Sequence, residues 1–379
     1  MKILYCISSF SAKGGTEKVL SSKAAYLAGK GHDITILISD QHNKPYAYGL
    51  PKNVTVRDLK ITGYLKNKLK GADFLRNIIT LRKIYSKEVA IINPDIIVVL
   101  ERGYEDFIIP YIHTKIPKVR EYHTSRKASE FFESSMPLIQ RLKAKMVRLF
   151  YEKQYRKYDK FIILTQKDAS SWRHFDNVEI IPNMVENVES EIQVEFVQKS
   201  KKLIAVGSMV ADRKGFSETI KIWSELAPKF TDWTLHIYGD GPYRNIYEKQ
   251  IKSLGINRQI FLEGVTDKID EKYKESQIFL MTSKGEGFGM VIIEAQQNGL
   301  PVIVYDCFSG PSDILKDDIG GFLIPMNNKE EFKIKLTKLL EDINLREMKS
   351  QEAIKNAARY NPKAIMPMWE KLFIELVSK

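Results

Sequence analysis

Cysteine is scarce in this chain, and the two that occur lie far apart. Cys6 and Cys307 are separated by most of the 379 residues, a spacing that fits neither a disulfide framework nor a metal cluster. Long apolar runs are missing too, since no stretch approaches the roughly 18 residues of a membrane-spanning helix. The first residues, MKILYCIS, begin directly as a strand and do not resemble a signal peptide. We therefore expect a protein of the reducing cytoplasm.

Familiar nucleotide and metal motifs are absent as well. No Asp-x-Asp pair in a suitable context points to a divalent metal, so neither a metal nor another cofactor is expected. Gly14 and Gly15 follow the first predicted strand, but their spacing differs from the G-x-G-x-x-G dinucleotide fingerprint. They form either a plain tight turn or a place where a bound group approaches the backbone, with Thr16 as the candidate helix N-cap.

Acidic residues are too few to balance the basic ones, and the formal net charge is +12. The excess lies in residues 1–185, which carry 32 lysines and arginines against 18 acids, whereas the remainder carries 27 against 29. A long basic amphipathic helix is predicted over residues 129–157. This pattern is typical of a protein that contacts an anionic membrane surface, lipid phosphates or nucleic acid, and equally of a sheet-covering helix with a lysine-rich solvent face.

Strand and helix patterns alternate along both halves, as in two doubly wound α/β domains. Most predicted strands are near-continuous apolar runs, which indicates parallel sheets covered on both faces. The first domain is predicted over residues 1–185, a connection over 186–200 and a second domain over 201–360, followed by a terminal helix over 361–379. The predicted strands are 2–8, 33–39, 54–59, 95–100, 118–122, 160–165 and 178–181, then 203–206, 234–238, 259–262, 278–281, 302–305 and 322–324.

The most informative stretch is IFLMTSKGEGFGMVIIEAQQNGLPVIVYD, residues 278–306. It predicts a buried strand, a glycine-rich loop with Glu286, a helix that opens near Met290 and carries Glu294, and a second strand. A helix N-terminus after glycines suits a phosphate group, and the two acids can accept hydrogen bonds from hydroxyls. Phosphate together with hydroxyls indicates a sugar nucleotide.

Three further side chains are predicted at carboxyl ends of strands, where open α/β folds bind ligands. His123 follows the strand 118–122 and is either a ligand contact or a solvated surface residue. Arg213 and Lys214 follow the first strand of the second domain, where they form either a clamp for a diphosphate or a charged loop tip.

Taken together, these motifs resemble the retaining "group 1" glycosyltransferases of the GT-B fold, which are related to glycogen and sucrose synthases. The most specific element is the pair of acids seven residues apart, Glu286-GFGMVII-Glu294. GGTEKV, IIPN, RKGF, YGDGP and FLEGVTDK occur in the expected order. The resemblance implies two Rossmann-like domains that face each other across a cleft, with the C-terminal helix crossing back to the first.

The resemblance also implies roles for individual residues. Glu294 would bind the ribose of the donor, and Glu286, with the backbone at Phe288 and Gly289, would hold the transferred sugar. Arg213, Lys214, Gly14 and Gly15 would contact the diphosphate. Val265 would lie beside the base, and His123 would lie close to the reacting sugar. One departure is Ser208, where relatives usually carry an arginine; either Arg213 replaces that arginine or the site has one cation fewer.

The implied reaction moves a hexosyl or N-acetylhexosaminyl group from a nucleotide-diphosphate sugar, most often a UDP-sugar, to a hydroxyl with anomeric retention. YDCFSGPSDIL resembles enzymes that extend bacterial capsules, lipopolysaccharide and other surface glycans, so the expected acceptor is a saccharide or a lipid-linked saccharide. An anionic membrane surface is a further candidate partner and nucleic acid is not. The alternatives are a non-hydrolysing sugar-nucleotide epimerase and a non-catalytic membrane- or nucleic-acid-binding protein.

Overall fold

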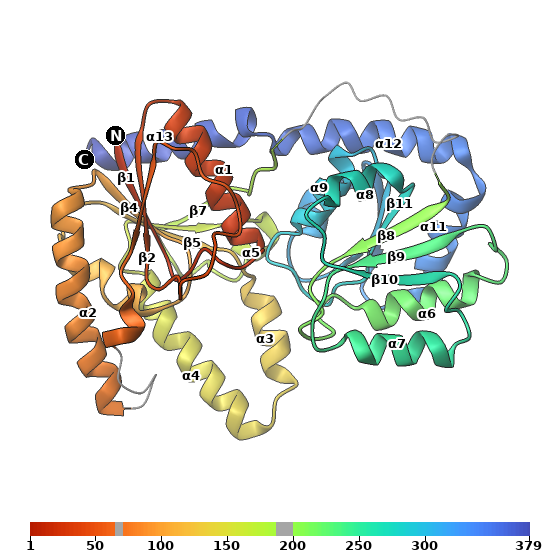
Figure 1. Ribbon diagram of the computed structural model, residues 1–379, viewed down its shortest axis with the longest axis horizontal. Helices are drawn as coiled ribbons and strands as arrows, with labels where there is room; N and C mark the ends of the chain where they lie inside the picture. Colours follow the sequence, from red (N-terminus) through yellow and green to blue (C-terminus); the bar gives the residue numbers. More distant parts are fainter. Residues whose placement is uncertain (65–70, 187–199) are drawn as a thin grey trace.

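The computed structural model describes residues 1–64, 71–186 and 200–379, which form two halves with one parallel sheet each. The halves lie side by side, and two helices near the C-terminus run along one edge of both (Figure 1). The predicted connection over residues 186–200 falls almost entirely outside the described residues.

The first sheet has the order β3-β2-β1-β4-β5-β6-β7, and its registered neighbours are parallel. Its strands are β1 (Lys2–Ile7), β2 (Asp33–Ile38), β3 (Val54–Asp58), β4 (Ile96–Val99), β5 (Lys118–Tyr122), β6 (Lys160–Ile163) and β7 (Val178–Ile180). The helices of this half are α1 (Gly15–Gly29), α2 (Gly71–Ile92), α3 (Arg126–Ser134), α4 (Leu138–Tyr155) and α5 (Gln166–Ala169).

The second sheet has the order β10-β9-β8-β11-β12-β13, again with parallel neighbours. Its strands are β8 (Lys202–Val206), β9 (Thr234–Tyr238), β10 (Ile260–Gly264), β11 (Ile278–Met281), β12 (Val302–Asp306) and β13 (Gly321–Pro325). The helices are α6 (Phe216–Leu226), α7 (Arg244–Ser253), α8 (Ile269–Glu275), α9 (Met290–Gln297), α10 (Pro311–Ile314), α11 (Lys329–Glu341) and α12 (Ile343–Ala357).

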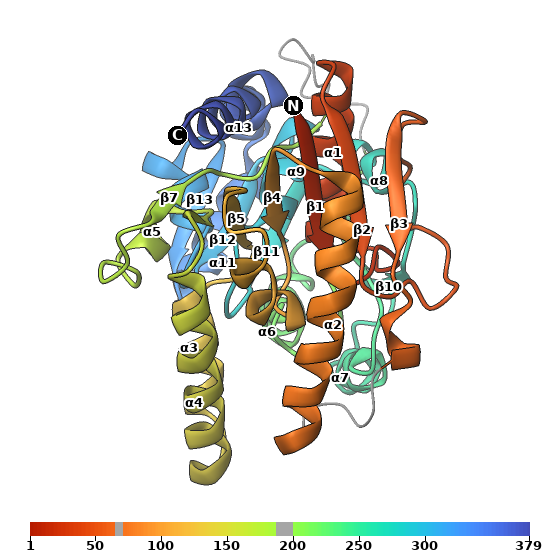
Figure 2. The same ribbon diagram turned by 90° about the vertical axis from the view of Figure 1, so that its left-hand side faces the viewer.

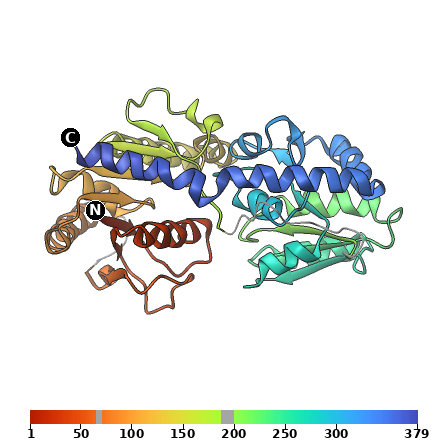
Figure 3. The same ribbon diagram turned by 90° about the horizontal axis from the view of Figure 1, so that it is seen from above.

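The terminal helix α13 (Pro362–Val377) returns to the first half, as the resemblance implied. Asn361 caps it by accepting a hydrogen bond from the backbone N–H of Ala364, and Pro362 occupies the first turn, where its missing N–H costs nothing. Trp369 and Phe373 are buried in the same apolar cluster as β1 and β4. Seen from above, α12 and α13 follow one another across both halves (Figure 3).

The structure corrects two local predictions. The single helix expected over residues 129–157 is a hairpin of α3 and α4, because Pro137 has no backbone N–H and disfavours a helical residue before it. This hairpin projects from the rest of the first half (Figure 2). Thr16 is not the cap of α1, since the helix already begins at Gly15 with Gly14 as N-cap.

Candidate functional site

Most of the predicted site residues lie where the strand order of each sheet reverses, whereas His123 and Val265 follow other strands, β5 and β10. β1 stands between β2 and β4, and β8 stands between β9 and β11. The loops after β1, β8 and β11 carry Gly14, Lys214 and Glu286, and His123 follows β5 directly. Ligands of doubly wound sheets bind at such reversal points, at the carboxyl ends of the strands. The two halves therefore present their binding edges to each other.

The loop between β11 and α9 packs closely against the first half, and its glycines make this possible. A Cβ on Gly287 would clash with the backbone carbonyl oxygen of His123. Gly289, the N-cap of α9, has φ of 98°, a left-handed conformation that suits glycine. The Glu-Gly-Phe-Gly sequence thus brings Glu286 and the start of α9 beside the end of β5.

Glu286 is held by a lysine of its own half. The ammonium Nζ of Lys214 lies 2.8 Å and 2.9 Å from the two carboxylate oxygens of Glu286. The aliphatic stem of Lys214 crosses Gly207, where an added Cβ would lie 2.8 Å from its Cγ. The structure therefore joins the residue predicted to hold the sugar with one of those predicted to hold the diphosphate.

Arg213 points in another direction from its neighbour. Its guanidinium lies over the ring of Phe132 in α3, with 4.6 Å between the guanidinium carbon and the ring centroid. Because α3 belongs to the first half, Arg213 bridges the halves by a cation–π contact. Lys214 and Arg213 are thus adjacent in sequence but have separate partners.

Glu294 is held across the interface between the halves by a residue that the sequence analysis did not single out. The Nζ of Lys18, in α1, lies 2.6 Å from a carboxylate oxygen of Glu294. Burial lowers the pKa of Lys18, but the Glu294 carboxylate, together with Asp270 and Tyr48, outweighs this effect and leaves the pKa raised. Lys18 lies one turn after Gly14 on α1, so its nearness to the glycine turn was the available signal.

His123 is also backed by residues that the sequence analysis missed. Its side chain is 8% exposed, and its Nε2 lies 3.2 Å from Oε2 of Glu121 on β5. The other carboxylate oxygen of Glu121 lies 2.5 Å from Nζ of Lys23 on α1. The histidine predicted beside the reacting sugar therefore rests on a buried ion pair.

The remaining predicted residues differ in their surroundings. An added Cβ on Gly15 would lie 4.0 Å from Cγ of Met290, so the first glycine turn faces the start of α9. Val265 follows β10 and is 62% exposed, which leaves its side chain accessible. Phe288 is buried with its ring 5.6 Å from that of Tyr360, so only its backbone is available to a ligand.

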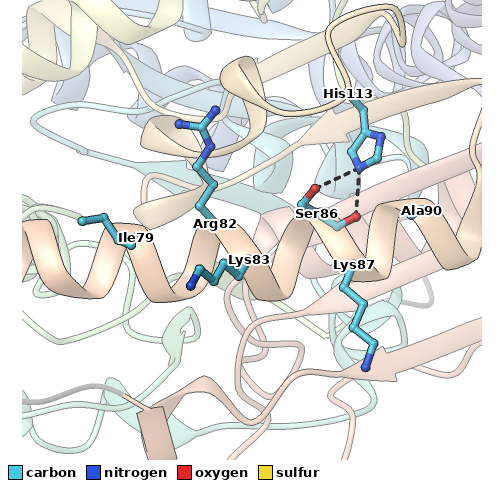
Figure 4. Close-up of a pocket in the computed structure, with 7 residues that line it drawn as sticks. All are labelled: Ile79, Arg82, Lys83, Ser86, Lys87, Ala90 and His113. Carbon is cyan, nitrogen blue, oxygen red and sulfur yellow. Dashed lines mark hydrogen bonds between the residues drawn. The ribbon is translucent and has the colours of Figure 1, made fainter.

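A separate pocket lies on α2 and shares no residue with the predicted site. Arg82, Lys83 and Lys87 contribute three cations. Nε2 of His113 lies 2.8 Å from the backbone carbonyl oxygen and 3.1 Å from the hydroxyl oxygen of Ser86 (Figure 4). The other lining residues are Ile79 and Ala90. The pocket is part of the basic surface of the first half rather than of the region between the sheets.

Two family models match this chain one after the other. The model described as "Glycosyltransferase Family 4" matches residues 13–187, and the one described as "Glycosyl transferases group 1" matches residues 187–359. The amylovoran biosynthesis glycosyltransferase AmsD of Erwinia amylovora is 28% identical over 98% of this chain and 99% of its own. A glycosyltransferase of Haemophilus influenzae is 26% identical over 97% of this chain and 99% of its own.

Solved structures give the same fold. The lipopolysaccharide glycosyltransferase WaaG matches with a TM-score of 0.76 at 16% identity, over 98% of this chain and 99% of its own. Sucrose-phosphate synthase of Thermosynechococcus elongatus matches with a TM-score of 0.81 at 16% identity, over 100% of this chain and 99% of its own. Because the two family matches together span residues 13–359, this chain belongs to the group 1 glycosyltransferases of the GT-B fold.

Proposed function

We propose that this glycosyltransferase moves a hexosyl or N-acetylhexosaminyl group from a nucleotide-diphosphate sugar, UDP-linked by preference, to a hydroxyl of a surface glycan or its lipid-linked precursor. The observation that carries the proposal is the pair of lysine-bound acids, Glu286 with Lys214 and Glu294 with Lys18, where the two sheets meet. Carboxylates bind the hydroxyls of sugar and ribose, and lysines bind phosphate.

The proposed mechanism is electrostatic. Breaking the bond between the sugar and the diphosphate builds negative charge on the β-phosphate. Fixed donors that stabilise such a charge lower a barrier by several kcal/mol. Cations of the site would serve in place of a divalent metal. Retention would follow from attack on the face that the phosphate leaves, with the phosphate taking the proton of the acceptor.

The nature of donor and acceptor is supported by relatives. The name of AmsD refers to the synthesis of amylovoran, and a Staphylococcus aureus TarM structure with a TM-score of 0.77 contains UDP and α-GlcNAc-glycerol. The poly(ribitol-phosphate) α-N-acetylglucosaminyltransferase of the same species is 27% identical over 56% of this chain. The UDP of the TarM structure supports a UDP-sugar donor for this chain, and the names of AmsD and of the poly(ribitol-phosphate) enzyme support a polymeric acceptor.

An anionic membrane on the cytoplasmic side is proposed as the place of action. No helix among the residues that the structure describes is long and apolar enough to cross a membrane. Helix α4 leaves a series of large apolar side chains exposed, alternating with Arg141, Lys143 and Lys145. Such a face suits binding to anionic lipid, whereas a second copy would bring like charges together. The apolar residues are Leu138, Ile139, Leu142, Met146, Val147, Leu149 and Phe150.

The test is turnover of a panel of UDP- and GDP-sugars with lipid and saccharide extracts as acceptors, followed by mass spectrometry of the products. Glu286→Ala and Glu294→Ala should each lose most of the transfer, whereas Glu248→Ala, at an exposed pair on α7, should match the parent. Equal turnover by all three variants would show that the site is elsewhere. Release of an epimerised sugar nucleotide without any acceptor would instead indicate an epimerase.

A further inference from the structure

Behind His123 lies a chain of buried groups that the proposed reaction does not yet explain. The side chains of Lys23 and Glu121 are only 2% and 1% exposed, and they form an ion pair of 2.5 Å. Each oxygen of Glu121 faces a different group, since Oε1 meets Lys23 and Oε2 lies 3.2 Å from Nε2 of His123. One carboxylate thus connects an ammonium group to the imidazole.

A buried ion pair is a poor way to stabilise a fold. Removing two charges from water costs several kcal/mol per ion, and apolar side chains of similar size often serve as well or better. Burial raises the pKa of Glu121, but Lys23 and then His123 counteract this and lower it to about 2. Glu121 therefore remains an ionised acceptor at neutral pH, always available to the ring of His123.

Both ring nitrogens of His123 are buried, and neither has a hydrogen-bond partner among the described residues. Nε2 lies 3.2 Å from Oε2 of Glu121, in ion-pair contact but not in a well-aligned hydrogen bond. A carboxylate beside Nε2 favours a proton on that nitrogen and thereby leaves Nδ1 as an acceptor when the ring is neutral. A buried nitrogen without a partner is costly unless a ligand completes it.

The crossing helix α13 covers the Lys23 end of this series of buried groups. Nζ of Lys23 lies 3.4 Å from the centroid of the Trp369 ring on α13, and Trp369 is 2% exposed. The aromatic face offers Lys23 a cation–π contact in place of water. The connection runs from α13 through α1 and β5 to the residue beside the glycine-rich loop of the second half.

We propose that Lys23 and Glu121 are positioning residues that fix the imidazole of His123, with Nδ1 free to accept a hydrogen bond from a hydroxyl of the transferred sugar. The proposal rests on the proposed function, because it takes the sugar to lie beside His123. Lys23 keeps Glu121 in place and Trp369 keeps Lys23 in place. Neither Lys23 nor Glu121 touches the substrate.

The experiment compares Glu121→Gln with the double variant K23M/E121Q. Glu121→Gln should lower kcat roughly 10- to 100-fold, because small displacements of a positioned group are costly, and it should also lower the thermal stability, because Lys23 is left unpaired. The double variant removes both charges, so its stability should recover while kcat stays low. Glu121→Asp should restore part of kcat, and KM for the donor should change by less than about threefold in all of them.

The matched control is the buried pair of Arg120 and Asp106, 2.7 Å apart, in which Arg120 lies on the face of β5 opposite to Glu121. Arg120→Met with Asp106→Asn should change stability but leave kcat within about twofold of the parent. If K23M/E121Q recovers kcat together with stability, the pair is merely structural and the proposal is overturned.

Imidazole NMR signals of His123, assigned by comparison with His123→Ala, provide a readout without turnover. Glu121→Gln and the double variant should both shift these signals, and the control pair should not. If the parent transfers no sugar but these shifts appear, the proposed function fails and the positioning survives. If the His123 signals do not shift in Glu121→Gln and in the double variant, the proposed positioning role of Lys23 and Glu121 is overturned, whatever the activity of these variants.

Discussion

Each of the two predicted acids is matched by one lysine, and under the proposed function this matching determines how a donor would bind. Glu286 holds Lys214, and Glu294 holds Lys18 from the other half. A donor must therefore exchange these partners rather than add contacts to free groups. We expect its phosphates to take over the lysines while its hydroxyls donate to the carboxylates, so that the opposite charges of donor and site are satisfied together.

Neither cysteine should react in the folded protein. Burial raises the pKa of the Cys6 thiol, and nearby Glu105 adds to the effect. Burial, together with Glu286, raises the pKa of Cys307 to about 12. Because the thiolate is the nucleophile, Ellman's reagent at pH 8 should titrate neither thiol until guanidinium unfolds the chain, and both afterwards. Rapid native reaction of either one would contradict the packing around it.

The predicted site residues that the structure brings together share one property. Glu286, Glu294, Arg213 and Lys214 stand in local motifs, at fixed distances from glycines and strand ends. Lys18, Lys23 and Glu121 were missed because their partners are set by how α1 approaches α9 and β5. Of these three, only Lys18 had a local signal, its nearness to the glycine turn. A lysine in a helix reads as a surface residue until its partner is known.

At the level of elements, the strands were the most predictable part. β5, β9 and β11 have the bounds expected from their sequence, because apolar runs between polar residues and glycines mark buried parallel strands. The break between α3 and α4 was missed although Pro137 marks it. The periodic pattern of α4 could not tell whether anything covers its apolar face, since the same pattern suits a buried helix and one that meets a membrane.

Helix α4 should bind anionic vesicles through both its charges and its apolar side chains. Each lysine near an anionic surface contributes about 1 kcal/mol, so Lys143→Glu with Lys145→Glu should weaken binding to phosphatidylglycerol vesicles at least about tenfold. Leu142→Gln with Met146→Gln should also weaken it, because apolar insertion is lost. Cosedimentation measures both effects.

The control for α4 is Lys249→Glu with Lys252→Glu, on the exposed face of α7 in the second half. This variant has the same net charge as the α4 charge variant and should bind like the parent. If the two charge variants lose binding equally, general charge rather than α4 mediates it. Binding by the parent to uncharged vesicles with equal affinity would also contradict the proposed surface.

At the level of the whole molecule, the halves are joined by loop contacts and by the crossing helix. Oγ1 of Thr165 lies 2.7 Å from Oγ of Ser309, and Asp313 accepts a hydrogen bond of 2.7 Å from the backbone N–H of Gln166. Two Rossmann-like units and a terminal helix were predictable from alternating patterns. How closely the halves approach was not, because it depends on side chains such as Lys18 that meet only in the folded protein.

Trp369 should be the main anchor of the crossing helix. Trp369→Ala removes a buried aromatic side chain and the contact with Lys23, a change that costs about 3–5 kcal/mol. Calorimetry should show the unfolding of the first half shifted down by roughly 10 °C, and limited proteolysis should cut near α13 sooner. Trp369→Phe keeps an aromatic face and should shift much less. Equal shifts in both variants would contradict this role, because Trp369→Phe keeps most of the apolar volume and an aromatic face toward Lys23.

The central claim is that Glu294 binds the nucleotide while Glu286 binds the sugar, and calorimetric titration with UDP and UDP-sugars tests it most directly. Glu294→Gln should lower the affinity for UDP itself about 10- to 100-fold, as expected for a lost hydrogen bond to a charged group. Glu286→Gln should leave the affinity for UDP within about twofold of the parent, and should reduce only the additional affinity that the sugar of a UDP-sugar contributes. UDP bound by Glu294→Gln as tightly as by the parent would contradict the account.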